Sequence, residues 1–111
     1  MVEKINISYS KFAIDFLDEL IFILYNENYF GFIENAESYV DEIYDSTKAY
    51  ILLKQYKKSP EKLKKHGNFY VTFKVNKKTT WYIFFNKKDN KYLVKYITNN
   101  HNKEAIWLNL L

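Results

Sequence analysis

The chain has no cysteine and no arginine, a single proline (Pro60), and only two glycines, Gly31 and Gly67. Without cysteine, neither a disulfide scaffold nor a thiolate metal site can form. Two isolated glycines cannot make a glycine-rich phosphate loop, which excludes the nucleotide-binding folds that depend on one. The only imidazoles belong to His66 and His101. We therefore expect no metal site and no cofactor.

Long apolar runs are also missing. The longest, LIFILY at residues 20–25, is far shorter than the roughly 20 residues that span a bilayer. The first twelve residues, MVEKINISYSKF, carry charge and lack the apolar core of a signal peptide. We therefore expect a cytoplasmic protein without a membrane segment. With 111 residues and 48% hydrophobic composition, the chain is expected to form one domain over residues 1–111.

Charge is divided unevenly along the chain, and every basic side chain except histidine is a lysine. Residues 1–47 hold two lysines and ten carboxylates, whereas residues 48–111 hold fifteen lysines and three carboxylates. The net charges of −8 and +12 give the total of +4. This asymmetry favours two faces with different partners. The alternative is that the two parts partly neutralise each other across the fold.

Alternating isoleucines in KINIS predict a first strand at residues 4–8. Ser10 is a candidate N-cap for the helix that follows. NENYFG at residues 26–31 ends that helix, and a second helix is expected over residues 32–56. The two apolar stripes recur at helical spacing. They are Ala13, Phe16, Leu17, Leu20, Ile21 and Leu24 in the first helix, and Ile33, Ala36, Val40, Ile43, Tyr44, Thr47 and Ile51 in the second. Two amphipathic helices with a short connection predict an antiparallel helical hairpin.

Residues 54–68 form a lysine-rich connection, after which aromatic and β-branched residues dominate. The runs FYVTFKV, TTWYIFF and YLVKYIT predict three antiparallel strands at residues 69–75, 79–85 and 92–98. The expected fold is α+β, in the order β-α-α-β-β-β. A helical hairpin packs on one face of a small antiparallel sheet and the other face stays free.

Candidate site residues belong to that free face and to the segments that border it. Tyr70 and Lys74 alternate onto one face of the second strand, and the lysine-rich connection lies near the start of that strand. Asn100 and His101 end the last strand. Lysines around exposed tyrosines suit single-stranded RNA, because ammonium groups neutralise phosphates and tyrosine rings stack on bases. An imidazole can also move protons at neutral pH. The candidate RNA-binding residues are Lys62, Lys64, Lys65, His66, Lys74 and Asn100.

Each of these residues also has a structural interpretation. The lysines can serve as a solvated surface, and strand tyrosines such as Tyr82 and Tyr96 can pack within the sheet. His101 at a strand end can be a solvated polar residue, and His66 a loop residue. The functional hypothesis therefore depends on the combination of residues.

The order of elements, together with NFYVTFKVNKKTTWYIFFN and YLVKYITNNH, resembles the RelE/ParE superfamily of bacterial type II toxins. The resemblance covers nearly the whole chain. It implies a small toxin, often encoded in plasmid-stabilisation systems, that a cognate antitoxin protein neutralises. RelE-like members cleave mRNA on the ribosome, whereas ParE-like members inhibit DNA gyrase without a nuclease site.

The resemblance also implies roles for individual residues. His101 matches a position beyond the last long strand that acts on the leaving group or the phosphate. Tyr70 is nearest to the position that contacts the phosphate, and Lys65 and Lys74 would hold phosphate. The chain departs from the family in lacking arginine, whose fork geometry lysine does not reproduce; some members use histidine instead.

The resulting prediction is a ribosome-dependent mRNA endoribonuclease that inhibits translation, with His101 and Tyr70 as catalytic residues. The alternatives are a ParE-like gyrase inhibitor and an inactive toxin-fold binding protein. The expected partners are a cognate antitoxin and mRNA on the ribosome, in a homodimer or a toxin–antitoxin hetero-oligomer.

Overall fold

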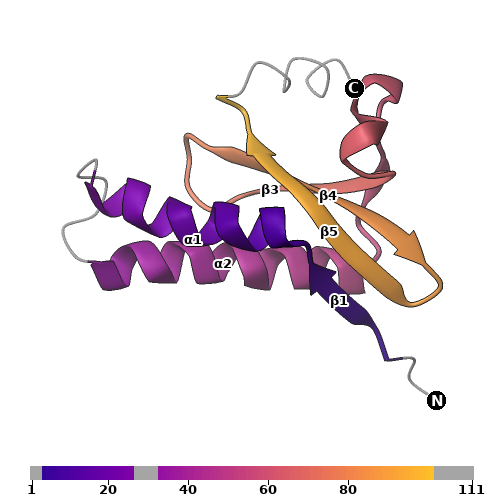
Figure 1. Cartoon of the computed structure of the whole chain (residues 1–111), viewed down its shortest axis with the longest axis horizontal. Helices are drawn as coiled ribbons and strands as arrows, with labels where there is room; N and C mark the ends of the chain where they lie inside the picture. The colour runs from indigo at the N-terminus through magenta and orange to yellow at the C-terminus, as the bar shows by residue number, and fades with distance from the viewer. Residues whose placement is uncertain (1–3, 27–32, 102–111) are drawn as a thin grey trace.

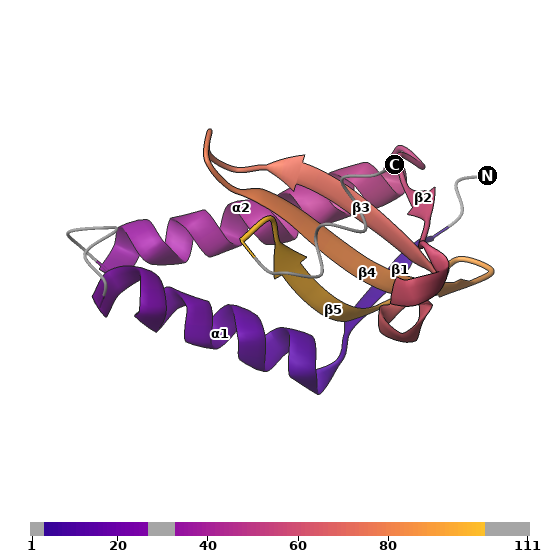
Figure 2. The ribbon, with the colours of Figure 1, turned by 90° about the horizontal axis from the view of Figure 1, so that it is seen from above.

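The computed structural model describes residues 4–26 and 33–101. They form two helices, α1 (Lys11–Asn26) and α2 (Ile33–Leu52), and a short 3₁₀ helix, η1 (Glu61–His66). The strands are β1 (Asn6–Tyr9), β2 (Lys57–Lys58), β3 (Phe69–Lys74), β4 (Thr80–Lys88) and β5 (Lys91–Asn99). In Figures 1 and 2, α1 and α2 run side by side along one face of the sheet. The expected α+β class, with a helical hairpin on one face of a sheet, is confirmed.

The sheet is mixed and has the strand order β1-β5-β4-β3-β2 within the described residues. β1 pairs with β5 in parallel, and the other neighbours are antiparallel. The expectation of a purely antiparallel sheet is therefore wrong. The alternation of side chains that predicts a strand says nothing about the direction of its partner. β2 was not predicted, because two residues are too few to show alternation.

Helix α1 begins where the sequence places it. The Ser10 hydroxyl accepts a hydrogen bond from the Ala13 amide at 3.2 Å, and the Ser10 carbonyl accepts one from the Ile14 amide at 3.0 Å. The first bond satisfies a donor that a helix start otherwise leaves unpaired, and the second is the first backbone bond of the helix. Together they confirm Ser10 as the N-cap. Ala13 and Leu17 of the predicted stripe are completely buried.

Helix α2 ends at Leu52, four residues before the predicted end at residue 56. Lys54 adopts a left-handed conformation, with φ of 56°. Its amide donates to the Ile51 carbonyl at 3.0 Å, and the Gln55 amide donates to the Tyr50 carbonyl at 2.9 Å. This pair of bonds is the Schellman motif, which closes a helix and turns the chain away. The motif is usually built on glycine, so a lysine gave no signal for it.

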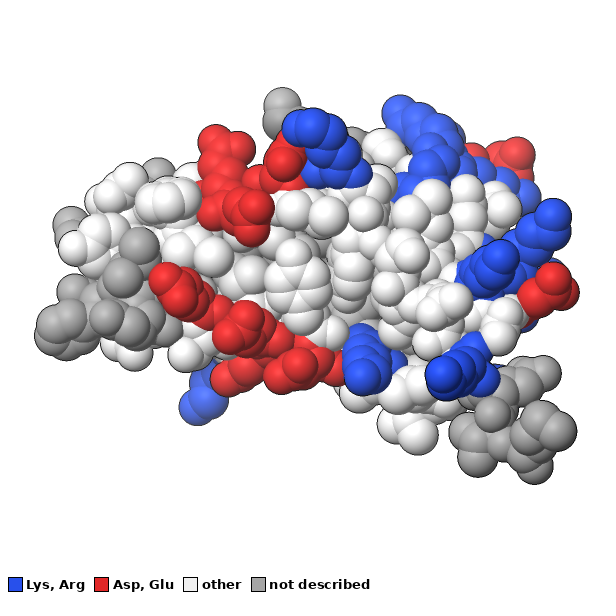
Figure 3. All heavy atoms as spheres, turned by 60° about the horizontal axis from the view of Figure 1, so that its bottom comes forward, with Lys and Arg blue, Asp and Glu red and all other residues white. Residues whose placement is uncertain are grey.

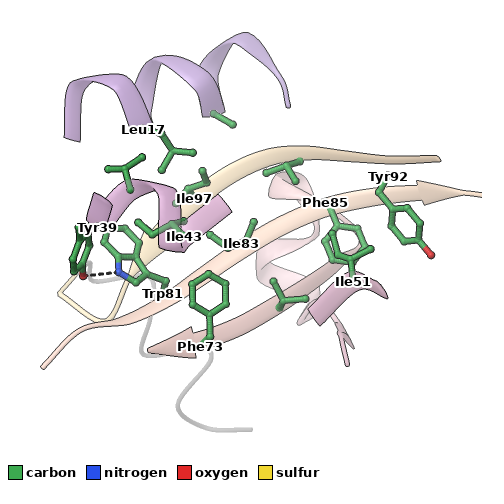
Figure 4. Packing of buried hydrophobic residues seen from close by; sticks show 14 residues of the cluster. Leu17, Tyr39, Ile43, Ile51, Phe73, Trp81, Ile83, Phe85, Tyr92 and Ile97 are labelled. Carbon is green, nitrogen blue, oxygen red and sulfur yellow. Dashed lines mark hydrogen bonds between the residues drawn. The ribbon is translucent and has the colours of Figure 1, made fainter. Parts of the chain in front are cut away.

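The main core lies between the hairpin and the sheet. Figure 4 shows Leu17, Ile43 and Ile51 of the helices facing Ile83 and Phe85 of β4. All five side chains are at most 1% exposed. Burying a side chain of this size stabilises a fold by about 1.5–3 kcal/mol. This apolar contact therefore holds the hairpin on its face of the sheet.

The opposite face of the sheet was expected from the sequence to be free, but η1 covers one end of it. Leu63 of η1 is 2% exposed and packs in a second buried cluster with Tyr70, Tyr82 and Phe84. Gly67 permits this approach. A Cβ at Gly67 would lie 2.7 Å from the Phe85 backbone nitrogen, and its φ of 156° disfavours other residues. The lysine-rich connection is therefore a folded cap on the sheet.

Acidic and basic side chains, which are unevenly distributed along the sequence, also lie in different regions of the structure. On the face shown in Figure 3, acidic side chains gather over the helical hairpin and most of the visible lysines lie toward the other end of the molecule. Of the helices in the described residues, none is long and apolar enough to cross a membrane.

Candidate functional site

The end of β5 presents His101 through two asparagines that precede it. The Asn99 side-chain oxygen accepts a hydrogen bond from the His101 amide at 2.9 Å. The Asn100 side-chain oxygen accepts one from the Thr80 amide at 2.9 Å, and its amide group donates to the Lys78 carbonyl at 3.3 Å. Asn100 therefore joins the end of β5 to the β3–β4 loop, and Asn99 fixes the backbone of His101.

The His101 ring lies over the β3–β4 loop. Its Nε2 is 3.5 Å from the Thr79 hydroxyl, at the limit of a hydrogen bond. The loop is held by Asn76, whose side-chain oxygen accepts from the amides of Lys78 at 3.1 Å and Thr79 at 2.9 Å. The Asn76 amide group donates to the Tyr39 hydroxyl at 3.2 Å. The histidine is thus placed by a hydrogen-bonded loop that is tied to helix α2.

A cavity of about 770 Å³ opens beside His101, between the hairpin and this end of the sheet. Its volume is within the usual range for small-molecule sites. Its described lining combines an apolar part with a polar part that carries two lysines. The apolar part is Leu20, Ile23, Leu24 and Trp81, and the polar part is Tyr39, Asn76, Lys77, Lys78, Thr79, Asn99 and His101. None of these residues is acidic, so the cavity favours an anionic ligand with an apolar portion. We call it the His101 cavity.

Tyr70 is far from this cavity. It pairs with Phe84, whereas Lys74, at the other end of β3, pairs with Thr80. Four residues of strand correspond to about 13 Å. Tyr70 also belongs to the cluster under η1, on the sheet face opposite to the helices. The structure therefore does not bring Tyr70 and His101 together.

Tyr70 is also buried, at 2% exposure. This burial, followed by the charge of Tyr82, raises the pKa of the Tyr70 hydroxyl above its usual value. The hydroxyl consequently stays protonated at neutral pH and cannot serve there as a base. In the structure its ring is occupied by contacts with Phe84 and Tyr82, at centroid distances of 5.5 and 6.3 Å. These contacts are those of a packing residue.

The candidate residues of η1 gather near Tyr70. The His66 ring stacks on Tyr96, with ring centroids 3.8 Å apart and an angle of 9° between the planes. Lys62, Lys64 and Lys65 are exposed on the same short helix. Lys64 forms an ion pair with Glu61 at 2.9 Å. Tyr96 also stacks with Phe12 of α1, at 5.6 Å.

The predicted residues therefore form two groups. Lys74, Asn100 and His101 belong to the end of the sheet beside the His101 cavity, while Tyr70, His66 and the η1 lysines belong to the other end. Sequence reasoning missed Asn76, Lys77, Lys78, Thr79 and Tyr39 of the cavity. Residues 76–78 lie between two predicted strands, Thr79 belongs to the predicted strand at residues 79–85, and Tyr39 belongs to the predicted second helix. No set of three or more metal-ligating side chains converges within residues 4–26 and 33–101.

Comparison with known proteins adds no relative. No protein-family model, curated protein or solved structure matches this chain. The class established by the structure is an α+β protein with two helices packed on a five-stranded mixed sheet.

Proposed function

We propose that the protein is an RNA-cleaving toxin of the RelE type that acts on mRNA at the ribosome, and that the His101 cavity is its catalytic site. The observation that carries the proposal is the placement of His101. An imidazole lines a cavity together with Lys77 and Lys78 and with no described carboxylate. The order of elements that resembles the RelE/ParE superfamily supports the same assignment.

This set of side chains suits cleavage of RNA by its own 2′-hydroxyl. The 2′-oxygen attacks phosphorus and the bond to the 5′-oxygen breaks, leaving a cyclic phosphate and a free 5′-hydroxyl. The proton of the 2′-hydroxyl passes to water, and His101 donates a proton to the departing 5′-oxygen. Lys77 and Lys78 stabilise the charge that develops on the phosphoryl oxygens. This proposal gives Tyr70 no role, because Tyr70 packs under η1 on the opposite face of the sheet.

Primer extension on cellular mRNAs after brief induction tests the proposal. We expect new cuts within translated frames for the wild type, reduced about 10²-fold or more by His101→Gln. The matched control is His66→Gln, which changes the other histidine of the chain, 35 positions earlier in the sequence. Circular dichroism establishes that both variants fold. Equal loss of cutting in the two folded variants would contradict the assignment of His101.

A second pair of variants locates the phosphate contacts. Lys77→Ala with Lys78→Ala removes both cavity lysines, whereas Lys62→Ala with Lys65→Ala removes two exposed lysines of η1. We expect the first pair to reduce cutting more strongly, because those lysines share the cavity with His101. If only the η1 pair matters, RNA is bound along the opposite end of the sheet and the cavity is not the site.

The second candidate is a binding protein without catalysis, either a gyrase inhibitor or an inactive toxin-fold protein. The observation that favours it is the separation of Tyr70 from His101, which leaves the described lining of the cavity with one imidazole and no carboxylate. Growth arrest without new mRNA cuts, combined with inhibition of gyrase supercoiling, would establish the gyrase alternative. No effect on growth would favour the inactive form.

The proposal includes a cognate antitoxin that covers lysine-rich surface. Contacts made by lysines are screened by salt, so copurification of the two proteins should weaken as salt concentration rises. Copurification that is unchanged in high salt would contradict a lysine-based interface. Sedimentation of the purified proteins would distinguish a homodimer from a toxin–antitoxin hetero-oligomer.

A further inference from the structure

β1 is one of the two outer strands of the described sheet and is paired on one side only (Figure 1). The Asn6 amide donates to the Asn90 carbonyl at 2.9 Å, and the Ser10 amide donates to the Val94 carbonyl at 2.8 Å. Because amides alternate along a strand, those of Ile7 and Tyr9 point away from β5. No described strand lies on that side. β1 therefore offers an open edge of about four residues.

A hollow of about 370 Å³ lies on the helix side of this edge. Ile7 and Tyr9 line it from β1, and Tyr44 lines it from α2. All three are only half-buried, and the Tyr44 ring meets the Tyr9 ring edge-on at 5.0 Å. Ile5 and Asn6 also line it, and Asp45 and Lys48 add charges of opposite sign that balance each other. We call it the tyrosine hollow; its described lining is neutral overall and combines apolar surface, from isoleucines and tyrosine rings, with polar groups.

A second hollow, of about 480 Å³, lies on the other face of the same edge. Its lining includes Asn6 and Ser8 of β1, the exposed Leu93, and three lysines. The lysines are Lys87, Lys88 and Lys91. None of them forms an ion pair with a carboxylate of the described residues. We call it the lysine hollow; its uncompensated positive charge favours an acidic partner.

Asp89 is the acidic residue nearest to these lysines in sequence, at the β4–β5 turn. It lines a different hollow, with Lys54, Lys87 and Tyr92. Among the described residues, the lysine hollow itself has no acidic lining. The charge that would complement Lys88 and Lys91 is therefore missing from the described part of the chain.

A strand added beside β1 would place its side chains alternately in the two hollows. Neighbouring strands are about 4.8 Å apart, so a residue opposite Asn6 would lie two strand spacings, about 9.6 Å, from Lys91. A glutamate and a lysine can together span this distance. Residues opposite Ile7 and Tyr9 would lie on the helix side, above the tyrosine hollow. The expected pattern is therefore acidic and apolar residues in alternation.

We propose that β1 binds an extended acidic peptide segment of a partner protein by strand addition. Backbone hydrogen bonds to Ile7 and Tyr9 supply affinity, and the two hollows supply specificity. A second copy of this chain suits the edge less well. Its own β1 would present Asn6 and Ser8 to the face that carries the lysines, and neither side chain is acidic. This surface is distinct from the His101 cavity.

The probe is the capped peptide acetyl-(Glu-Val)₃-amide, titrated into the ¹⁵N-labelled protein. We expect the amide resonances of Ile7 and Tyr9 to shift. Two N-methylated peptides test the strand geometry, one methylated on its glutamates and the other on its valines. Amides of alternate residues point to opposite sides of a strand, so only one of the two should lose binding, by about tenfold. Equal binding by both, or no shift at Ile7 and Tyr9 at millimolar peptide, would overturn the proposal.

Charge reversal supplies the second test. We expect Lys91→Glu to weaken the glutamate peptide about tenfold and to strengthen acetyl-(Lys-Val)₃-amide. The matched control is Lys58→Glu, which changes an exposed lysine on β2, the strand at the opposite edge of the sheet. It should leave both affinities unchanged. If Lys91→Glu and Lys58→Glu change the peptide affinities equally, the attraction is non-specific and the proposal is wrong. If the protein is a dimer that the peptide dissociates, a second copy of the chain occupies β1 instead.

Discussion

The Tyr39 hydroxyl joins the core to the His101 cavity, and its removal is the sharpest stability test of this structure. The hydroxyl accepts hydrogen bonds from the Trp81 indole nitrogen at 3.0 Å and from the Asn76 amide group at 3.2 Å. Figure 4 shows the first bond between α2 and β4. Tyr39→Phe keeps the ring and removes both of these bonds.

The two lost bonds differ in cost. Trp81 is 2% exposed, so its indole N–H would be left buried without this acceptor, at a cost of about 1–3 kcal/mol. Asn76 is exposed and can bond to water instead, so its loss costs little. The cavity beside Trp81 lets water approach the ring, which favours the lower part of the range. We expect Tyr39→Phe to lower the free energy of unfolding by about 1–2 kcal/mol.

Urea denaturation monitored by circular dichroism measures this change. The matched control is Tyr50→Phe, on the same helix. The Tyr50 ring stacks on Phe73 at 5.7 Å, and its hydroxyl has no hydrogen bond to the described residues. We expect this control to stay within about 0.5 kcal/mol of the wild type. Trp81→Phe completes a double-mutant cycle, because Tyr39→Phe should cost much less once the indole is gone.

Two results would refute this reasoning. One is a loss of unfolding free energy in Tyr39→Phe that is no larger than the loss in Tyr50→Phe. The other is the same Tyr39→Phe cost with and without Trp81, which would show that the indole bond does not couple α2 to β4.

Three further predictions follow from local geometry. Gly67→Ala should cost at least 2 kcal/mol in urea denaturation, because its Cβ would lie 2.7 Å from the Phe85 nitrogen and the chain must move; a neutral result would contradict the close contact of η1 with β4. Ser10→Ala should lower the free energy of unfolding by about 1 kcal/mol, because it removes the hydroxyl that accepts from the Ala13 amide. Ser10→Asp keeps an acceptor at this position and should retain most of that stability, and thermal unfolding of both variants measures the difference. Burial, and after it the charge of Tyr44, raises the pKa of Tyr9 to about 12. Its stabilising contribution should be complete below pH 10 and should fall by about 2 kcal/mol as pH rises to 12, because the folded chain keeps a proton that the unfolded chain loses. Tyr9→Phe has no hydroxyl to titrate and should not show this loss of stability between pH 10 and pH 12. If the free energy of unfolding falls with pH equally in the wild type and in Tyr9→Phe, the prediction is wrong.

The candidate site was only partly predictable from sequence. His101 could be singled out because it follows a β-rich run after two asparagines, and the structure gives both asparagines a role in placing it. The cavity beside it could not be predicted, because its lining comes from α1, α2, the β3–β4 loop, β4 and the end of β5. Tyr70 was misjudged for a related reason. Its position on the face opposite to the helices is correct, but η1 covers that end of the face with Leu63.

The sequence by itself determined the elements whose signals are local. Side-chain periodicity placed both helices and the three long strands, and the hydroxyl at Ser10 placed the start of α1. The divided charge along the chain was compatible with two charged regions or with partial neutralisation across the fold, and the structure separates an acidic hairpin from a lysine-rich end (Figure 3). Only the tertiary structure decided the parallel pairing of β1 with β5, the folding of the lysine-rich connection into β2 and η1, and the separation of Tyr70 from His101. These features depend on contacts between residues distant in sequence, which no local pattern specifies. The free edge of β1, and with it the proposed peptide site, has the same origin.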